Sequence, residues 1–124
     1  MSVLLASSLL VAANATAQQP TEGYISISML YKDTQTGGEN LLSNVVVNLL
    51  DYNGNVIASQ VSNPTVIFHV PLGNYIIDAP SVSLGSYVYE EVKQQITLSS
   101  SSINTNLTMY RTALNNSLSL TIYS

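Results

Sequence analysis

The 124-residue chain contains no cysteine, no tryptophan and one histidine, and its charged side chains are three Lys or Arg and seven Asp or Glu. Without cysteine there is no thiol nucleophile, disulfide framework or cysteine zinc site, and one histidine cannot form a multi-histidine metal site. Lys32, Lys93 and Arg111 are too few to neutralise a run of phosphates. We therefore expect no cofactor, no bound metal and no nucleic-acid partner.

Charge is scarce although the hydrophobic fraction is ordinary. Hydrophobic residues make up 46% of the chain and charged residues 8%, against about 25% charged in an average globular domain. Ser, Thr, Asn and Gln replace the missing ions at the surface, as in the serine run 99–102. Such a surface stays hydrated without depending on carboxylate ionisation, which favours an acidic exterior or a coat of sugar.

No group of residues predicts catalysis. His69 is the only imidazole, and no G-x-S-x-G elbow accompanies the abundant serines. Glu90 and Glu91 are adjacent in a strand pattern and therefore point to opposite faces. The eight tyrosines are spread along the chain, which is typical of packing rather than of a sugar-stacking site. We expect the protein not to be an enzyme.

The first seventeen residues, MSVLLASSLLVAANATA, carry no charged side chain. As a secretory signal, this segment has an apolar centre and a small-residue site at Ala15-Thr16-Ala17, but it lacks a positive start. It is too short for a membrane span, which needs about 20 apolar residues. As a β-strand it has period two. The apolar residues of its odd-numbered face are Met1, Val3, Leu5, Leu9, Val11, Ala13, Ala15 and Ala17. The first six of these are the side chains that could fill an apolar groove.

Three N-glycosylation sequons occur, with acceptors Asn14, Asn106 and Asn115. An acceptor asparagine must face solvent, and its modification requires a secretory route. The sequons therefore agree with an extracellular, cell-surface location and with N-linked glycans.

After a short linker at 18–23, the body of the chain, 24–124, reads as a series of short strands separated by turns. Asn53-Gly54 predicts a type I′ hairpin turn. Ile25, Ile27 and Met29 form the inward face of the first strand. The pattern predicts an all-β, Ig-like or transthyretin-like sandwich of about seven strands. The expected strands are 25–31, 45–50, 56–61, 66–70, 75–78, 87–98, 103–110 and 118–123.

The stretch Val66-Ile67-Phe68-His69-Val70-Pro71-Leu72-Gly73-Asn74-Tyr75 resembles a turn of transthyretin-like and Cna-B-type repeat domains. In some such domains a lysine near the first strand forms an isopeptide bond with an asparagine or aspartate on the last strand, assisted by a carboxylate. The corresponding residues would be Lys32, Asp78 and either Asn104 or Asn106. Lys32 falls on the outward register of its strand, so we expect a solvated lysine and no crosslink.

An unpaired apolar strand would be an aggregation site, so the first segment must pair with something. Addition to the edge of another copy is a head-to-tail contact that extends into a filament. This organisation resembles the thread-type pili of thermoacidophilic archaea, whose glycosylated β-sandwich subunits are joined by donor-strand complementation. The resemblance implies a pilus subunit with a role in adhesion or biofilm, other copies of itself as partners and no membrane span in the assembled form.

Two other interpretations stay open. A type IV pilin would use the first segment as a helical filament core, although Pro20 would end that helix early. A secreted carbohydrate-binding or surface-layer accessory module would use it only as a signal peptide.

Overall fold

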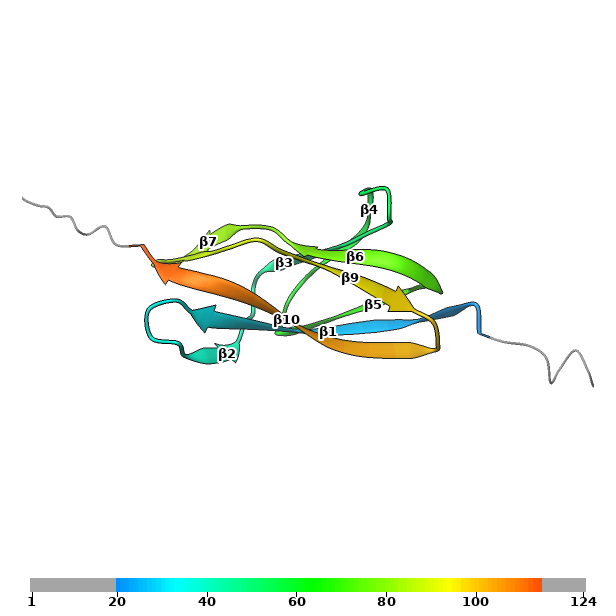
Figure 1. Cartoon of the computed structure of the whole chain (residues 1–124), viewed down its shortest axis with the longest axis horizontal. Helices are drawn as coiled ribbons and strands as arrows, with labels where there is room; N and C mark the ends of the chain where they lie inside the picture. The colour runs from blue at the N-terminus through cyan, green and yellow to red at the C-terminus, as the bar shows by residue number, and fades with distance from the viewer. Residues whose placement is uncertain (1–19, 115–124) are drawn as a thin grey trace, which may run out of the picture.

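The structure, a computed structural model, describes residues 20–114 as an all-β sandwich of two sheets (Figure 1). The expected fold class is thereby confirmed. Residues 1–19 and 115–124 lie outside the described part, and with them the predicted donor strand, the sequons at Asn14 and Asn115, and the expected strand at 118–123.

Each sheet combines strands from distant parts of the chain. The six-stranded sheet has the order β2-β1-β10-β8-β7, with β5 also paired to β1. The four-stranded sheet has the order β4-β3-β6-β9. In the first sheet the strands are β1 Glu22–Asp33, β2 Glu39–Leu41, β5 Thr65–Pro71, β7 Val82–Leu84, β8 Tyr87–Tyr89 and β10 Ser102–Ala113. In the second they are β3 Val46–Leu50, β4 Val56–Val61, β6 Gly73–Ala79 and β9 Val92–Leu98.

The core lies between the sheets and follows the period-two alternation of the strands. The predicted inward face of the first strand is confirmed, because Ile25, Ile27 and Met29 are completely buried. The neighbouring β10 contributes Leu107 and Met109 from the same sheet. The opposite sheet supplies Val47, Leu49, Ile77, Ile96 and Leu98. Alternate apolar residues therefore fill one layer between the sheets.

Two local predictions are wrong. The expected long strand 87–98 is divided into β8 and β9, which belong to different sheets, because the chain crosses between the sheets at Glu90-Glu91. The turn at Asn53-Gly54 is not type I′, since Gly54 has a φ of 88° but Asn53 has no positive φ. The carboxylate of Asp51 instead accepts hydrogen bonds from the main-chain N–H groups of Asn53 and Asn55, both at 2.9 Å.

The strands β1 and β10 lie side by side and run in the same direction. Their register pairs Tyr24 with Ser102 at one end and Asp33 with Arg111 at the other. Both strands therefore begin at the same end of the molecule. Figure 1 shows that the described chain enters at this end and leaves, after β10, at the opposite end of the long axis.

Candidate strand-acceptor edge

The outer edge of β10 is only partly covered. Arg111, Thr112 and Ala113 pair with β8, but no strand within residues 20–114 pairs with the outer edge of Ser102–Met109. By contrast, the edge of β1 that faces away from β10 is covered along most of its length, because β5 pairs with residues 22–28 and β2 pairs with residues 30–32. We call the uncovered edge of Ser102–Met109 the open edge. One further strand could pair with β10 along this edge.

Main-chain hydrogen bonds show which residues of β10 face this open edge. Ser101 O accepts from Tyr24 N of β1 at 2.9 Å, and Tyr110 O accepts from Glu90 N on the outer side at 2.8 Å. Alternate residues of a strand direct their N–H and C=O groups to the same side. Odd-numbered residues of β10 therefore bond to β1, and Asn104, Asn106 and Thr108 direct their main-chain groups outward.

The core side of the open edge is less well covered toward its beginning. Ile103 and Thr105 are half-buried, whereas Leu107 and Met109 are buried. Gln94 of β9 reaches across from the opposite sheet and donates through Nε2 to Thr105 Oγ1 at 3.4 Å. No cavity is present in the described part of the molecule. The open edge can therefore take an added strand by backbone pairing, and such a strand would cover Ile103 and Thr105.

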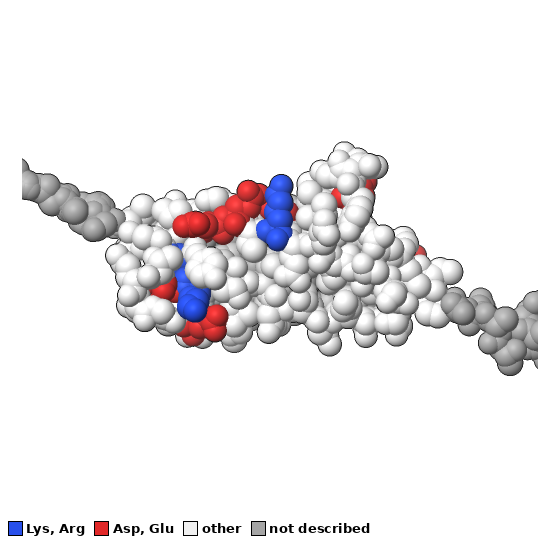
Figure 2. All heavy atoms as spheres, viewed as in Figure 1, with Lys and Arg blue, Asp and Glu red and all other residues white. Residues whose placement is uncertain are grey.

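The open edge is also free of the features that protect edge strands. Residues 102–110 contain no charged side chain and no proline, the residues that usually prevent edge pairing. Figure 2 shows Lys, Arg, Asp and Glu gathered over one half of the visible face, while the half that carries the beginnings of β1 and β10 is largely uncharged. A neutral, apolar strand would meet little electrostatic cost there.

Two of the other edges, those of β5 and β4, are less suited to this role. The main-chain N–H of Ile67 in β5 donates to Gln60 Oε1 at 3.2 Å, and the amide nitrogen of Gln60 donates to Ile67 O. This side-chain amide occupies the middle of the β5 edge as a neighbouring strand would. The β4 edge lies opposite a register shift between Leu49 and Leu50, and such a bulge twists an edge strand away from further pairing.

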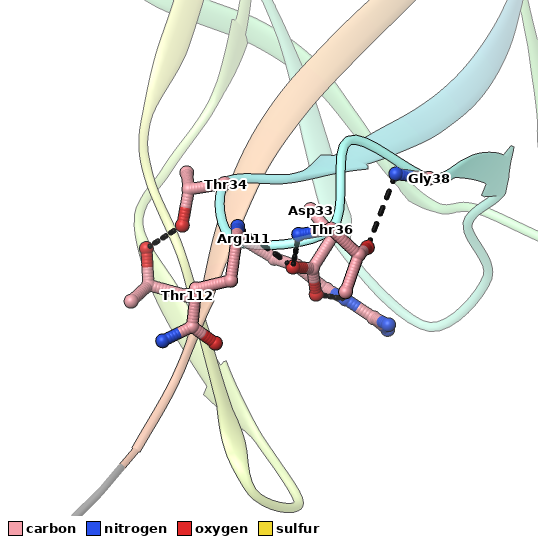
Figure 3. Close-up of polar contacts among 7 residues, drawn as sticks. Asp33, Thr34, Thr36, Gly38, Arg111 and Thr112 are labelled. Atoms are coloured by element: carbon pink, nitrogen blue, oxygen red, sulfur yellow. Dashed lines mark hydrogen bonds and ion pairs between the residues drawn. The ribbon is translucent and has the colours of Figure 1, made fainter.

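The far end of β10 is fastened by a polar cluster (Figure 3). Arg111 Nε donates to Asp33 Oδ2 at 2.8 Å, and the hydroxyls of Thr34 and Thr112 lie 2.9 Å apart. Asp33 Oδ1 also accepts from the main-chain N–H groups of Gln35 and Thr36. The Arg111 hydrogen bond, followed by these main-chain bonds, lowers the pKa of Asp33 to about 2. The Asp33 carboxylate therefore stays ionised at pH values above about 2.

A second carboxylate is perturbed in the opposite direction. Asp78 in β6 is 9% exposed, and its Oδ1 atom has no hydrogen-bond partner within residues 20–114. Burial, followed by the neighbouring Glu91 carboxyl, raises the pKa of Asp78 to about 6, although Lys93 acts in the opposite sense. The described part of the chain has no group of three side chains suited to a metal ion.

The sequence-predicted residues that fall within 20–114 are dispersed. Asn106 is exposed on the outer face of β10, and Lys32 is exposed on β1. The register of β1 and β10 places Lys32 opposite Tyr110 and not opposite Asn104 or Asn106, and Asp78 lies in the other sheet. Lys32 is therefore not brought beside either asparagine. His69 is exposed, stacks on the ring of Tyr24 at 4.3 Å and lies 3.3 Å from the carboxylate of Glu22.

The open edge was not identified from the sequence, and the glycosylation, donor-strand and domain predictions stay predictions. The signal that could have indicated the edge is the long uncharged run at 102–110 without proline. Within the described residues, no helix has the length and apolar character needed to cross a membrane.

No family model and no curated protein matches the sequence. The fold is similar to GBS52, the minor pilin of Streptococcus agalactiae, with a TM-score of 0.58 and 14% identity over 84% of this chain and 48% of that one. It is also similar to BcpA*(D312A), the major pilin subunit of Bacillus cereus, with a TM-score of 0.51 and 17% identity over 73% of this chain and 30% of that one. The chain thus spans less than half the length of these two pilins.

A third solved structure matches at nearly full length. It is a proposed carbohydrate-binding protein from Pseudomonas aeruginosa, with a TM-score of 0.50 and 18% identity over 81% of this chain and 96% of that one. At these identities the similarities establish a shared β-sandwich fold, which is the class to which this chain belongs.

Proposed function

We propose that the protein is a structural subunit of an extracellular pilus-like filament. In this filament, residues 1–17 of one copy add as a β-strand to the open edge of β10 in the next copy. The observation that carries the proposal is the open edge of Ser102–Met109, which has no partner strand within residues 20–114. In the same sheet, the far side of the neighbouring strand β1 is covered along most of its length by β5 and β2. The fold shared with two pilins supports the same role.

The chemistry of the two surfaces is complementary. The open edge offers outward main-chain groups at Asn104, Asn106 and Thr108, and a strand satisfies such groups by continuing the ladder. The odd-numbered face of residues 1–17 would lie over the half-buried Ile103 and Thr105. Burial of the five larger apolar donor side chains at about 1.5–3 kcal/mol each gives on the order of 10 kcal/mol before ordering costs. These side chains are Met1, Val3, Leu5, Leu9 and Val11.

The proposal divides the chain into a donor strand at 1–17, a linker at 18–23, whose last two residues already belong to β1, and a β-sandwich at 24–124. Glycans on Asn14, Asn106 and Asn115 would cover a surface that has few ions. Because donor and acceptor are different surfaces, the contact is heterologous and does not close. Repetition of this contact produces a filament suited to adhesion or biofilm.

The test moves residues 1–17 from the N-terminus to a position after Ser124, joined by a flexible linker long enough to reach the chain's own open edge. We expect soluble monomers, because each edge is then occupied by its own strand, and electron microscopy should show no filaments. A control carries the same fusion with Val3, Leu5 and Leu9 changed to Ser, which should leave the edge unfilled. Filaments formed equally well by the fused chain would contradict the proposal.

A second candidate is a secreted carbohydrate-binding module, favoured by the third structural similarity and by an exposed aromatic stack. Tyr24 is 50% exposed, and its ring lies 12° from the plane of His69. This candidate predicts a native chain that begins near Gln18 and does not assemble. The mass of the intact native protein distinguishes the two functions.

A further inference from the structure

We infer that, within the proposed filament, the donor strand lies parallel to β10, and that its first half, around Met1–Leu9, makes the contact with the open edge. This inference rests on the proposed function and adds the direction and the register of the joint. The topology of β1 and β10 carries it.

The first step is the position of the open edge along β10. The register of β1 and β10 places Ser102 beside Tyr24, at the end where the described chain enters the fold. The residues covered by β8, from Arg111 to Ala113, lie at the opposite end. The open edge therefore occupies the half of the molecule nearest to its own chain entry (Figure 1).

The second step follows the donor segment into the neighbouring copy. When copies repeat in the same direction along the long axis, the segment that precedes β1 leaves one copy and meets the next copy at its β8 end. It must pass this end before it reaches the open edge, and its N-terminus leads. Its N-to-C direction is then the same as that of β10, which makes the added pair parallel. Entry into the open edge of its own chain would need a reversal and would give an antiparallel pair.

The third step is length. From Ser102 to Ala113, β10 has 12 residues, which span about 40 Å at about 3.3 Å per residue. Residues 1–17 span about 56 Å when extended. The segment is thus long enough to pass the part covered by β8 and to fill the open edge with its first half. Met1, Val3 and Leu5 would then bury against Ile103 and Thr105, while Val11 and Ala13 would cross the junction.

The open edge itself accepts a parallel strand. Its neighbour β1 already pairs with β10 in parallel over ten residue positions, from Tyr24 opposite Ser102 to Asp33 opposite Arg111. A parallel donor would give β10 parallel neighbours on both sides along its first half. The outward N–H and C=O groups at Asn104, Asn106 and Thr108 can bond to either direction of strand, so the direction is set by where the donor enters.

The chain has no cysteine, so introduced cysteine pairs report the direction without interference. Four double variants combine Ser2→Cys or Ser8→Cys in the donor with Ser102→Cys or Thr108→Cys in β10. Filaments of each variant are oxidised, and crosslinks between subunits are quantified on denaturing gels. Each single variant serves as the control.

A parallel strand predicts crosslinks for Ser2 with Ser102 and for Ser8 with Thr108, because the two donor residues and the two β10 residues are each six positions apart, and little product for the exchanged pairs. The reverse pattern overturns the inference and leaves the proposed filament intact. Filaments without any of the four crosslinks overturn β10 as the acceptor. If the unaltered protein forms no filaments, the proposed function itself fails, and this inference fails with it.

Discussion

Arg111 and Asp33 join the ends of two parallel strands, with 2.8 Å between Nε and Oδ2. The guanidinium also lies between two aromatic rings, 4.0 Å from the centre of Tyr31 and 3.8 Å from that of Tyr87. At the other end of the same strands, the bond from Tyr24 N to Ser101 O closes the pair by main chain alone. Side chains thus hold β1 and β10 together at the end where β8 pairs with β10. At the other end, where the open edge begins, the outward main-chain groups of β10 can pair with an added strand.

Replacement of Asp33 by Asn tests this fastening. The pKa of Asp33 is lowered to about 2 from 3.8 in the unperturbed group, so its carboxylate contributes stability that is full above pH 3.8 and is lost as pH falls through about 2. We expect the variant to melt several degrees lower at neutral pH, and the difference to shrink as pH falls from 3.8 through about 2. Thermal melts over this pH range provide the measurement, and an unchanged melting temperature at neutral pH would contradict it.

Asp78 should give the opposite pH dependence. Its pKa is raised from 3.8 to about 6, so the folded state holds the proton more tightly than the unfolded state. The stability that results is full below pH 3.8 and is lost as pH rises through about 6. We expect the melting temperature to fall between pH 4 and pH 7, and this fall to be smaller in Asp78→Asn. An equal fall in both proteins would show that other groups cause it.

The matched variants Asn106→Pro and Asn106→Ala distinguish the contribution of the main chain of the open edge to filament formation from that of its side chains. Both changes remove the sequon asparagine, but only proline removes the outward N–H group. We expect the alanine variant to form filaments and the proline variant to form few or none, as counted by electron microscopy. Thermal melts must show that both variants are folded. Equal numbers of filaments from the two folded variants would exclude this edge as the acceptor.

Strand periodicity predicted much of the body, because alternation fixes the buried face before any tertiary contact is known. Ile25, Ile27 and Met29 were identified as core from this pattern alone, and all three are completely buried. The division of 87–98 could not be predicted in this way, since the polar middle of that stretch is compatible with an edge strand as well as with a crossing between sheets. The crossing depends on the partners that Tyr89 and Val92 find in opposite sheets.

The open edge could not be located from the sequence for a related reason. Nothing local to Ser102–Met109 indicates that β1 is its parallel neighbour or that β8 ends at Tyr89. A strand has an open edge where no other strand pairs with it. The position of such an edge therefore depends on how all the strands of the sheet are ordered. The composition of the stretch, uncharged and without proline, becomes informative only after the edge has been located.

Gly23 provides a test at the start of the same strand pair. A Cβ atom at this position would lie 2.7 Å from Ser100 O and 2.8 Å from Ser101 O. Because these are main-chain atoms, Gly23→Ala must push the start of β10 away from β1. We expect a loss of about 1–3 kcal/mol in the free energy of unfolding, measured by urea denaturation, and fewer filaments because the beginning of the open edge is displaced.

Gly38→Ala is the matched control for this change. Its added Cβ would meet only the Thr36 hydroxyl, at 3.3 Å, and that side chain can move. Gly38 also lies in the turn that follows β1, away from the beginning of β10. The control should therefore be much less destabilised and should form filaments normally. If both alanine variants lose the same stability, close contact between the starts of β1 and β10 does not explain the glycine at position 23.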